Sequence, residues 1–94
     1  MTTDLIKTKF AQIKAEQRTG LILFLTAGYP DLEATRELIP TLVEAGADAI
    51  ELGIPFSDPL ADGATIQSSS FHALCQGTTL RGCLDLVRDV RPLI

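Results

Sequence analysis

Three carboxylates stand close together around one loop of this 94-residue chain. Glu51 lies near the end of the apolar run "ADAIEL", and Asp58 and Asp62 follow in "GIPFSDPLADGATIQ". A carboxylate with apolar neighbours loses hydration, which raises its pKa and suits it to accept and donate protons. Pro55 and Pro59 stiffen the loop between the acids, and a catalytic group that is misplaced by about 1 Å loses much of its effect. The segment therefore predicts acid–base chemistry by carboxylates.

The same acids also have structural interpretations. Asp58 and Asp62 could be turn or N-cap residues, because Asp62 precedes a glycine and a predicted helix. Glu51 could be a buried structural residue, and the three acids together could bind Mg²⁺. The residue types alone leave these alternatives open.

Other catalytic chemistries lack the residues that they need. A Schiff-base aldolase requires a lysine in its cavity, yet Lys7, Lys9 and Lys14 all fall in the first predicted helix. The single histidine, His72, is expected to be a surface or packing residue, so a transition-metal site is not expected. The glycines form neither a dinucleotide-binding motif nor a P-loop. What remains is a carboxylate enzyme without a cofactor.

Charge, hydropathy and cysteine content indicate which classes of partner and which cellular compartment to expect. The formal net charge is −4 without a basic run, so neither nucleic acid nor an anionic membrane is expected as a partner. The longest apolar run, "LILFL", suits a strand and is too short to cross a membrane. Cys75 and Cys83 form neither a disulfide framework nor a CxxC motif, and both are expected to be reduced in a cytoplasmic protein.

The elements that must position the acids alternate between helix and strand. Thr3 or Asp4 caps a first helix and Asp31 a second, which ends at Gly46 in a left-handed conformation. Pro40 is expected to kink or split that second helix. Buried strands separated by helices indicate parallel pairing and an α/β class, in one domain over residues 1–94. Helices are predicted over residues 4–17, 31–45, 64–76 and 80–90, and strands over 21–26 and 47–52.

Alternation along the second strand sets the direction of Glu51. Ala47, Ala49 and Glu51 share one face, whereas Ile50 and Leu52 share the other, which suits packing against helices. Active sites of parallel α/β sheets and barrels lie beyond the carboxyl ends of the strands. Glu51 is expected at that end, on the face that lines a cavity.

The segment "ELGIPFSDPLADGATIQ", preceded by "AGADAI" and further upstream by "FLTAGYPD", resembles the signature region of the tryptophan synthase alpha chain family. The resemblance covers essentially the whole chain, with Ala64 where the family usually has proline. It implies a (β/α)₈ TIM barrel, to which this chain contributes an N-terminal helix and the first two βα units. It also implies retro-aldol cleavage of indole-3-glycerol phosphate to indole and glyceraldehyde 3-phosphate in tryptophan biosynthesis.

The resemblance further implies roles for four residues at the substrate. Glu51 matches the family's general acid and base, which protonates the indole ring carbon and removes the proton of the glycerol hydroxyl. Asp62 matches the carboxylate that accepts the indole N–H. Phe24 corresponds to a wall of the indole pocket, and Ile66 is a weaker candidate for the same pocket.

The loop that contains Pro55, Asp58 and Pro59 resembles the family's contact with the beta chain, in an assembly of two alpha and two beta chains. Pyridoxal phosphate is expected only in the beta chain, and no cofactor or metal in this one. A complete barrel takes about 250 residues, so the barrel is expected to be incomplete here. The chain is therefore either a part of an active lyase or a truncated, catalytically inactive piece that acts through protein interaction.

Overall fold

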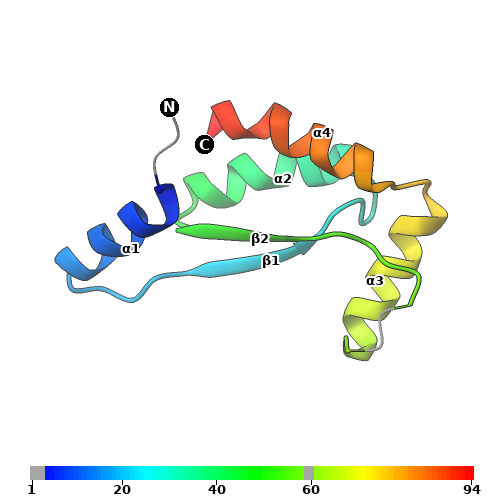
Figure 1. Ribbon diagram of the computed structural model, residues 1–94, viewed down its shortest axis with the longest axis horizontal. Coiled ribbons are helices and arrows are strands. Elements are labelled where there is room, and N and C mark those ends of the chain that lie inside the picture. Colours follow the sequence, from blue (N-terminus) through cyan, green and yellow to red (C-terminus); the bar gives the residue numbers. More distant parts are fainter. Residues whose placement is uncertain (1–3, 59–60) are drawn as a thin grey trace.

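Residues 4–58 and 61–94 are described by a computed structural model, and they fold into alternating helices and strands (Figure 1). The predicted order of elements is confirmed, and their bounds agree to within a few residues. The elements are α1 (Leu5–Ala15), β1 (Ile22–Thr26), α2 (Leu32–Glu44), β2 (Ala49–Gly53), α3 (Ala64–Cys75), α4 (Leu80–Val90) and a short 3₁₀ turn (Arg91–Leu93).

Side-chain caps define the starts of the helices. The Asp4 carboxylate accepts the Lys7 N–H at 3.0 Å at the start of α1, and the Asp31 carboxylate accepts the Ala34 N–H at 2.8 Å at the start of α2. Both predicted aspartate caps are thus present, and they satisfy amides that a helix end leaves without partners. Helix α2 continues through Pro40, so the expectation of a split helix is wrong.

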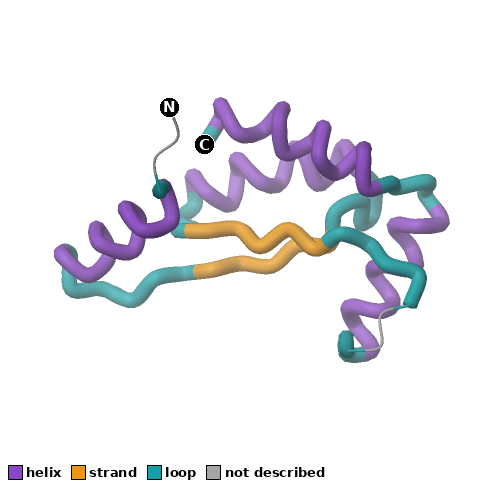
Figure 2. The backbone as a smooth tube through the Cα atoms, in the orientation of Figure 1, coloured by secondary structure: helices purple, strands orange, loops and turns teal. Residues whose placement is uncertain are grey.

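The two strands pair in parallel, as predicted, and form a two-stranded sheet (Figure 2). The register places Phe24 opposite Glu51 and Thr26 opposite Gly53. Since side chains alternate along each strand, Ile22, Phe24 and Thr26 share the sheet face of Glu51.

Helices α2 and α4 cover the other sheet face, above the strands in Figure 1. Ile39 of α2 and Leu86 and Val90 of α4 are buried between the helices and the sheet. The sheet contributes alternate apolar side chains to this core, as the alternation of Ile50 and Leu52 predicted. The half-buried side chains packed against the three core residues are Leu25, Leu32, Ile50 and Leu52.

The face that carries Glu51 is open. Ile22 is 46% exposed and Phe24 is 44% exposed, although both are large apolar residues. Helices α1 and α3 lie off opposite ends of the strands rather than across this face (Figure 1). The carboxyl ends of the strands point towards α3, which places α3 at the end where the catalytic residues of parallel α/β folds lie.

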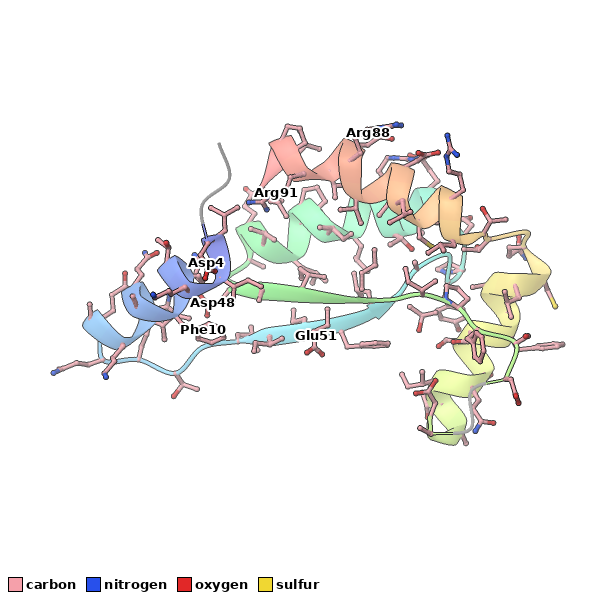
Figure 3. The ribbon with its side chains drawn as sticks, viewed as in Figure 1. Asp4, Phe10, Asp48, Glu51, Arg88 and Arg91 are labelled. Atoms are coloured by element: carbon pink, nitrogen blue, oxygen red, sulfur yellow. The ribbon has the colours of Figure 1, made fainter. Side chains whose placement is uncertain are left out.

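A charged cluster ties the segment between α1 and β1 to Asp48, the residue before β2. The Arg18 guanidinium donates to both Asp48 carboxylate oxygens at 2.8 and 2.9 Å, and the Leu21 N–H donates to the same carboxylate at 2.8 Å. The Asp48 side chain is only 6% exposed. The hydrogen bonds from Arg18, and then that from Leu21, lower the pKa of Asp48 from 3.8 to about 2. This cluster lies at the end of the sheet opposite α3 (Figure 3).

Candidate active site

Glu51 stands on the open face of β2, pointing away from α2 and α4 (Figure 3). Its side chain is exposed, so neither the buried structural role nor the expected desolvation by apolar neighbours is found among the described residues. No hydrogen bond or ion pair within residues 4–58 and 61–94 engages its carboxylate. Glu51 is the central residue of β2 (Ala49–Gly53), two residues before the end of the strand, because the strand continues past the expected boundary to Gly53. Its exposed carboxylate is available to a bound molecule.

Phe24 is the cross-strand neighbour of Glu51, and a glycine makes room for its ring. A Cβ added at Gly53 would overlap the Phe24 ring atoms Cζ and Cε2. The Phe24 ring therefore lies over the end of β2, on the same face as Glu51. This apolar wall beside a carboxylate is what an aromatic substrate would require. The role of Gly53 was not predicted, because its only signal in the sequence is the absence of a side chain.

Asp62 precedes α3 and does not cap it. The N-cap of α3 is Gly63, with no side-chain hydrogen bond to the helix start. The capping interpretation of Asp62 is therefore wrong. The Asp62 carbonyl oxygen accepts the Gln67 side-chain N–H at 2.8 Å, while its carboxylate is exposed. Like that of Glu51, the Asp62 carboxylate has no hydrogen bond or ion pair within the described ranges.

The remaining predicted residues lie around α3 and the loop before it. Ile66 is half-buried in the first turn of α3. Pro55 is half-buried and Asp58 is exposed, whereas the predicted contact at Pro59 lies outside the described residues. A cavity of about 470 Å³ separates this loop from α3, and its lining residues are Phe56, Ser57, Gln67, Phe71, Leu74 and Cys75.

The part of the chain that the structure describes brings no three His, Cys, Asp or Glu side chains into a metal-binding group. The Mg²⁺ site considered for Glu51, Asp58 and Asp62 therefore has no support in the arrangement of these residues. His72 lies on α3 with its ring edge-to-face against Tyr29, at a centroid distance of 5.1 Å. Cys75 and Cys83 are both free thiols, and Cys75 is exposed whereas Cys83 is buried.

Sequence reasoning missed how α3 is held against the strands. The Thr26 and Ser69 hydroxyl oxygens are 2.7 Å apart, although 43 positions separate these residues. Single hydroxyl residues at such a separation carry no periodic signal. The contact depends on how α3 packs against β1 in the tertiary structure.

Two parallel strands joined through α2, with α2 and α4 packed on one sheet face and the exposed Glu51 on the other, correspond to the opening βα units of a (β/α)₈ barrel. The sequence profile of the tryptophan synthase alpha chain family matches residues 10–94. The tryptophan synthase alpha chain of Geobacter sulfurreducens is 61% identical over 82 residues, which cover 87% of this chain and 31% of that protein.

Solved structures show the same likeness. The tryptophan synthase alpha subunit of Legionella pneumophila superposes with a TM-score of 0.92 at 38% identity, over 97% of this chain and 35% of that one. A chain of the tryptophan synthase α2β2 complex of Pyrococcus furiosus gives a TM-score of 0.72 at 48% identity, over 78% and 31%. The chain belongs to the tryptophan synthase alpha chain family. It spans about a third of the length of the curated relatives that it matches.

No helix within residues 4–58 or 61–94 has the length and apolar character needed to cross a membrane.

Proposed function

We propose that this chain supplies the acid–base carboxylates for cleavage of indole-3-glycerol phosphate into indole and glyceraldehyde 3-phosphate. The observation that carries the proposal is the exposed Glu51 carboxylate on the open face of β2, beside Phe24 and without a hydrogen bond or ion pair to any described residue. Family membership supplies the reaction, and the geometry is consistent with it, because an aromatic ring bound against Phe24 would also meet Glu51.

Glu51 would transfer both protons of this retro-aldol reaction. Protonation of the indole ring carbon leaves the ring short of electrons, and loss of the glycerol hydroxyl proton turns that C–O bond into a carbonyl. The electron pair of the broken carbon–carbon bond returns to the indole ring. One carboxyl group that gives a proton and takes one back ends in its starting state, so no external acid or base is consumed.

Asp62 would stabilise the positive charge that develops on the indole ring by accepting the ring N–H. A carboxylate that is already in place at the start of the reaction stabilises such charge without reorganising at that moment. Phe24 would form one wall of the indole pocket, and Ile66 would contribute from the first turn of α3. The reaction as written requires no cofactor in this chain.

The loop after β2 would contact a tryptophan synthase beta chain, which would carry pyridoxal phosphate in an assembly of two alpha and two beta chains. Ile54 is 42% exposed and Phe56 is 61% exposed in this loop, and Asp58 is exposed as well. Exposed apolar side chains beside the stiffening Pro55 favour a preorganised interface. These exposed residues also favour a second candidate function, in which the chain binds a beta chain without catalysing the reaction.

A chimaeric protein separates the two candidates. Residues 10–94 replace the matching segment of the Geobacter sulfurreducens alpha chain, and indole release from indole-3-glycerol phosphate is measured with and without a beta chain. We expect the 94-residue chain alone to release no indole and the chimaera to release it. Glu51→Gln should lower the rate by at least about 100-fold.

Glu44→Gln is the matched control, because Glu44 is an exposed glutamate at the end of α2, away from the open face. It should leave indole release unchanged. A folded chimaera that is inactive but binds the beta chain would favour the interaction function. Full activity of Glu51→Gln would refute the assignment of the general acid and base.

A further inference from the structure

Helix α3 is attached to the end of β1 and to the turn that follows it. The Thr26 and Ser69 hydroxyls form a hydrogen bond of 2.7 Å, and the Tyr29 and His72 rings meet edge-to-face. Next to these contacts, the Thr78 side chain fills the space in which a Cβ at position 28 would lie. These contacts, called the α3–β1 joint from here on, connect α3 with the strand that carries Phe24.

The hydroxyl pair has a defined direction. The Ser69 hydroxyl donates its single proton to the Ile66 carbonyl oxygen at 3.0 Å. The Thr26 hydroxyl must then be the donor to Ser69. Thr26 is only 8% exposed and Ser69 is half-buried, so water competes weakly for this hydrogen bond.

Asp62 depends on α3 for its place. Gln67 of α3 reaches back and donates to the Asp62 carbonyl oxygen at 2.8 Å, which fixes the backbone of Asp62 to the first turns of the helix. The segment on the other side, residues 56–58, is exposed. Among the described residues, the attachment of α3 to β1 therefore relates Asp62 to the strand beside Glu51.

We propose that Thr26 and Ser69 are positioning residues, whose hydrogen bond sets the place of Asp62 relative to Glu51. The proposal rests on the proposed function, since it matters for catalysis only if both carboxylates act on one substrate. Neither hydroxyl needs to touch that substrate. Misplacement of a reacting group by about 1 Å costs on the order of 100-fold in rate, so one such joint is sufficient to affect the reaction.

The test uses the 94-residue chain and measures amide hydrogen exchange together with the backbone amide resonance of Asp62. Thr26→Val keeps the side-chain shape and removes the hydroxyl, and Ser69→Ala removes the other partner. Loss of one hydrogen bond should speed exchange of the α3 amides by about two- to tenfold through easier local opening. The Asp62 resonance should move in both variants. Exchange of the α4 amides should stay unchanged.

Three further variants make the result specific. Thr26→Ser keeps the hydroxyl and should restore both readouts. The double variant Thr26→Val/Ser69→Ala should exchange no faster than either single variant, because both remove the same hydrogen bond. Ser68→Ala is the matched control, since Ser68 is an exposed neighbour on the same helix, and it should change neither readout.

Unchanged exchange in both loss variants would overturn the proposal, as would additive effects in the double variant. Faster α3 exchange with an unmoved Asp62 resonance would also overturn it, because the joint would then stabilise the helix without positioning Asp62. Unprotected α3 amides in the unaltered chain would show that the joint does not hold α3 at all. None of these readouts requires indole release. The exchange and resonance results can therefore contradict the positioning role while the chimaera releases indole, and they can support that role while the chimaera is inactive.

Discussion

Replacement of Leu86 by alanine should destabilise the chain more than any other leucine truncation on α4. Leu86 is fully buried between α2, α4 and the sheet. Leu→Ala removes about three carbon groups, at about 0.8 kcal/mol each, or about 2.4 kcal/mol of transfer free energy. The cavity that remains brings the usual cost of such a change to about 3–5 kcal/mol.

Leu84→Ala is the matched control, because Leu84 lies on the same helix and is 57% exposed. Only about 43% of the transfer free energy applies there, which predicts about 1 kcal/mol. The assay is urea unfolding followed by circular dichroism, with the free energy of unfolding compared at equal denaturant slopes.

Equal costs for Leu84→Ala and Leu86→Ala would refute the assignment of α4's inner face. That result would also weaken the placement of Glu51, because the covered and open sheet faces are defined by where α2 and α4 pack. A domain of this size has a total stability of about 5–14 kcal/mol. We therefore expect a substantial fraction of the Leu86→Ala variant to be unfolded at urea concentrations below the unfolding midpoint of the unaltered protein.

Three further predictions concern the ends of the sheet. The pKa of Asp48 is lowered from 3.8 to about 2. The contribution of the Asp48 carboxylate to stability is therefore complete above about pH 4 and is lost as the pH falls towards 2. The decrease of Tm with falling pH should be weaker in Asp48→Asn than in the unaltered chain. Gly53→Ala places a Cβ against the Phe24 ring and should cost about 1–3 kcal/mol in urea unfolding, and a second change, Phe24→Leu, should recover part of this loss; full additivity would contradict the contact. Gly46→Ala should lower the free energy of unfolding by about 1 kcal/mol, because φ of Gly46 is +125°. Gly63→Ala should lower it less, because the space around Gly63 is equally open but its φ is −73°. Equal melting temperatures of the two variants would contradict this reasoning.

Local sequence signals predicted the elements well, because the signals are local. Asp4 and Asp31 cap helices through amides three residues further on, and the apolar runs before Thr26 and Gly53 form strands. The split that was considered at Pro40 did not occur, since α2 runs continuously from Leu32 to Glu44. The local preference of proline disfavours a helix interior, but α2 is amphipathic and packs through Ile39, and this packing outweighs the loss of one backbone hydrogen bond.

The candidate site was predictable only in part. The period of two placed Glu51 on the face opposite Ile50, and the structure agrees. Burial of Glu51 could not be predicted, because it depends on what lies across the open face rather than on its own strand. The cap proposed for Asp62 failed by one position, since Gly63 adopts the capping conformation instead.

The sequence by itself thus determined the order of elements, the direction of Glu51 and the family signature, all of which depend on residue types at short and regular spacing. Only the tertiary structure decided which side chains meet. The strand register places Phe24 beside Glu51. The Arg18–Asp48 pair joins residues that are 30 positions apart in the sequence, and the Thr26–Ser69 pair joins residues that are 43 positions apart. Contacts of this kind depend on how strands and helices pack, and packing joins residues whose separation along the chain follows no period.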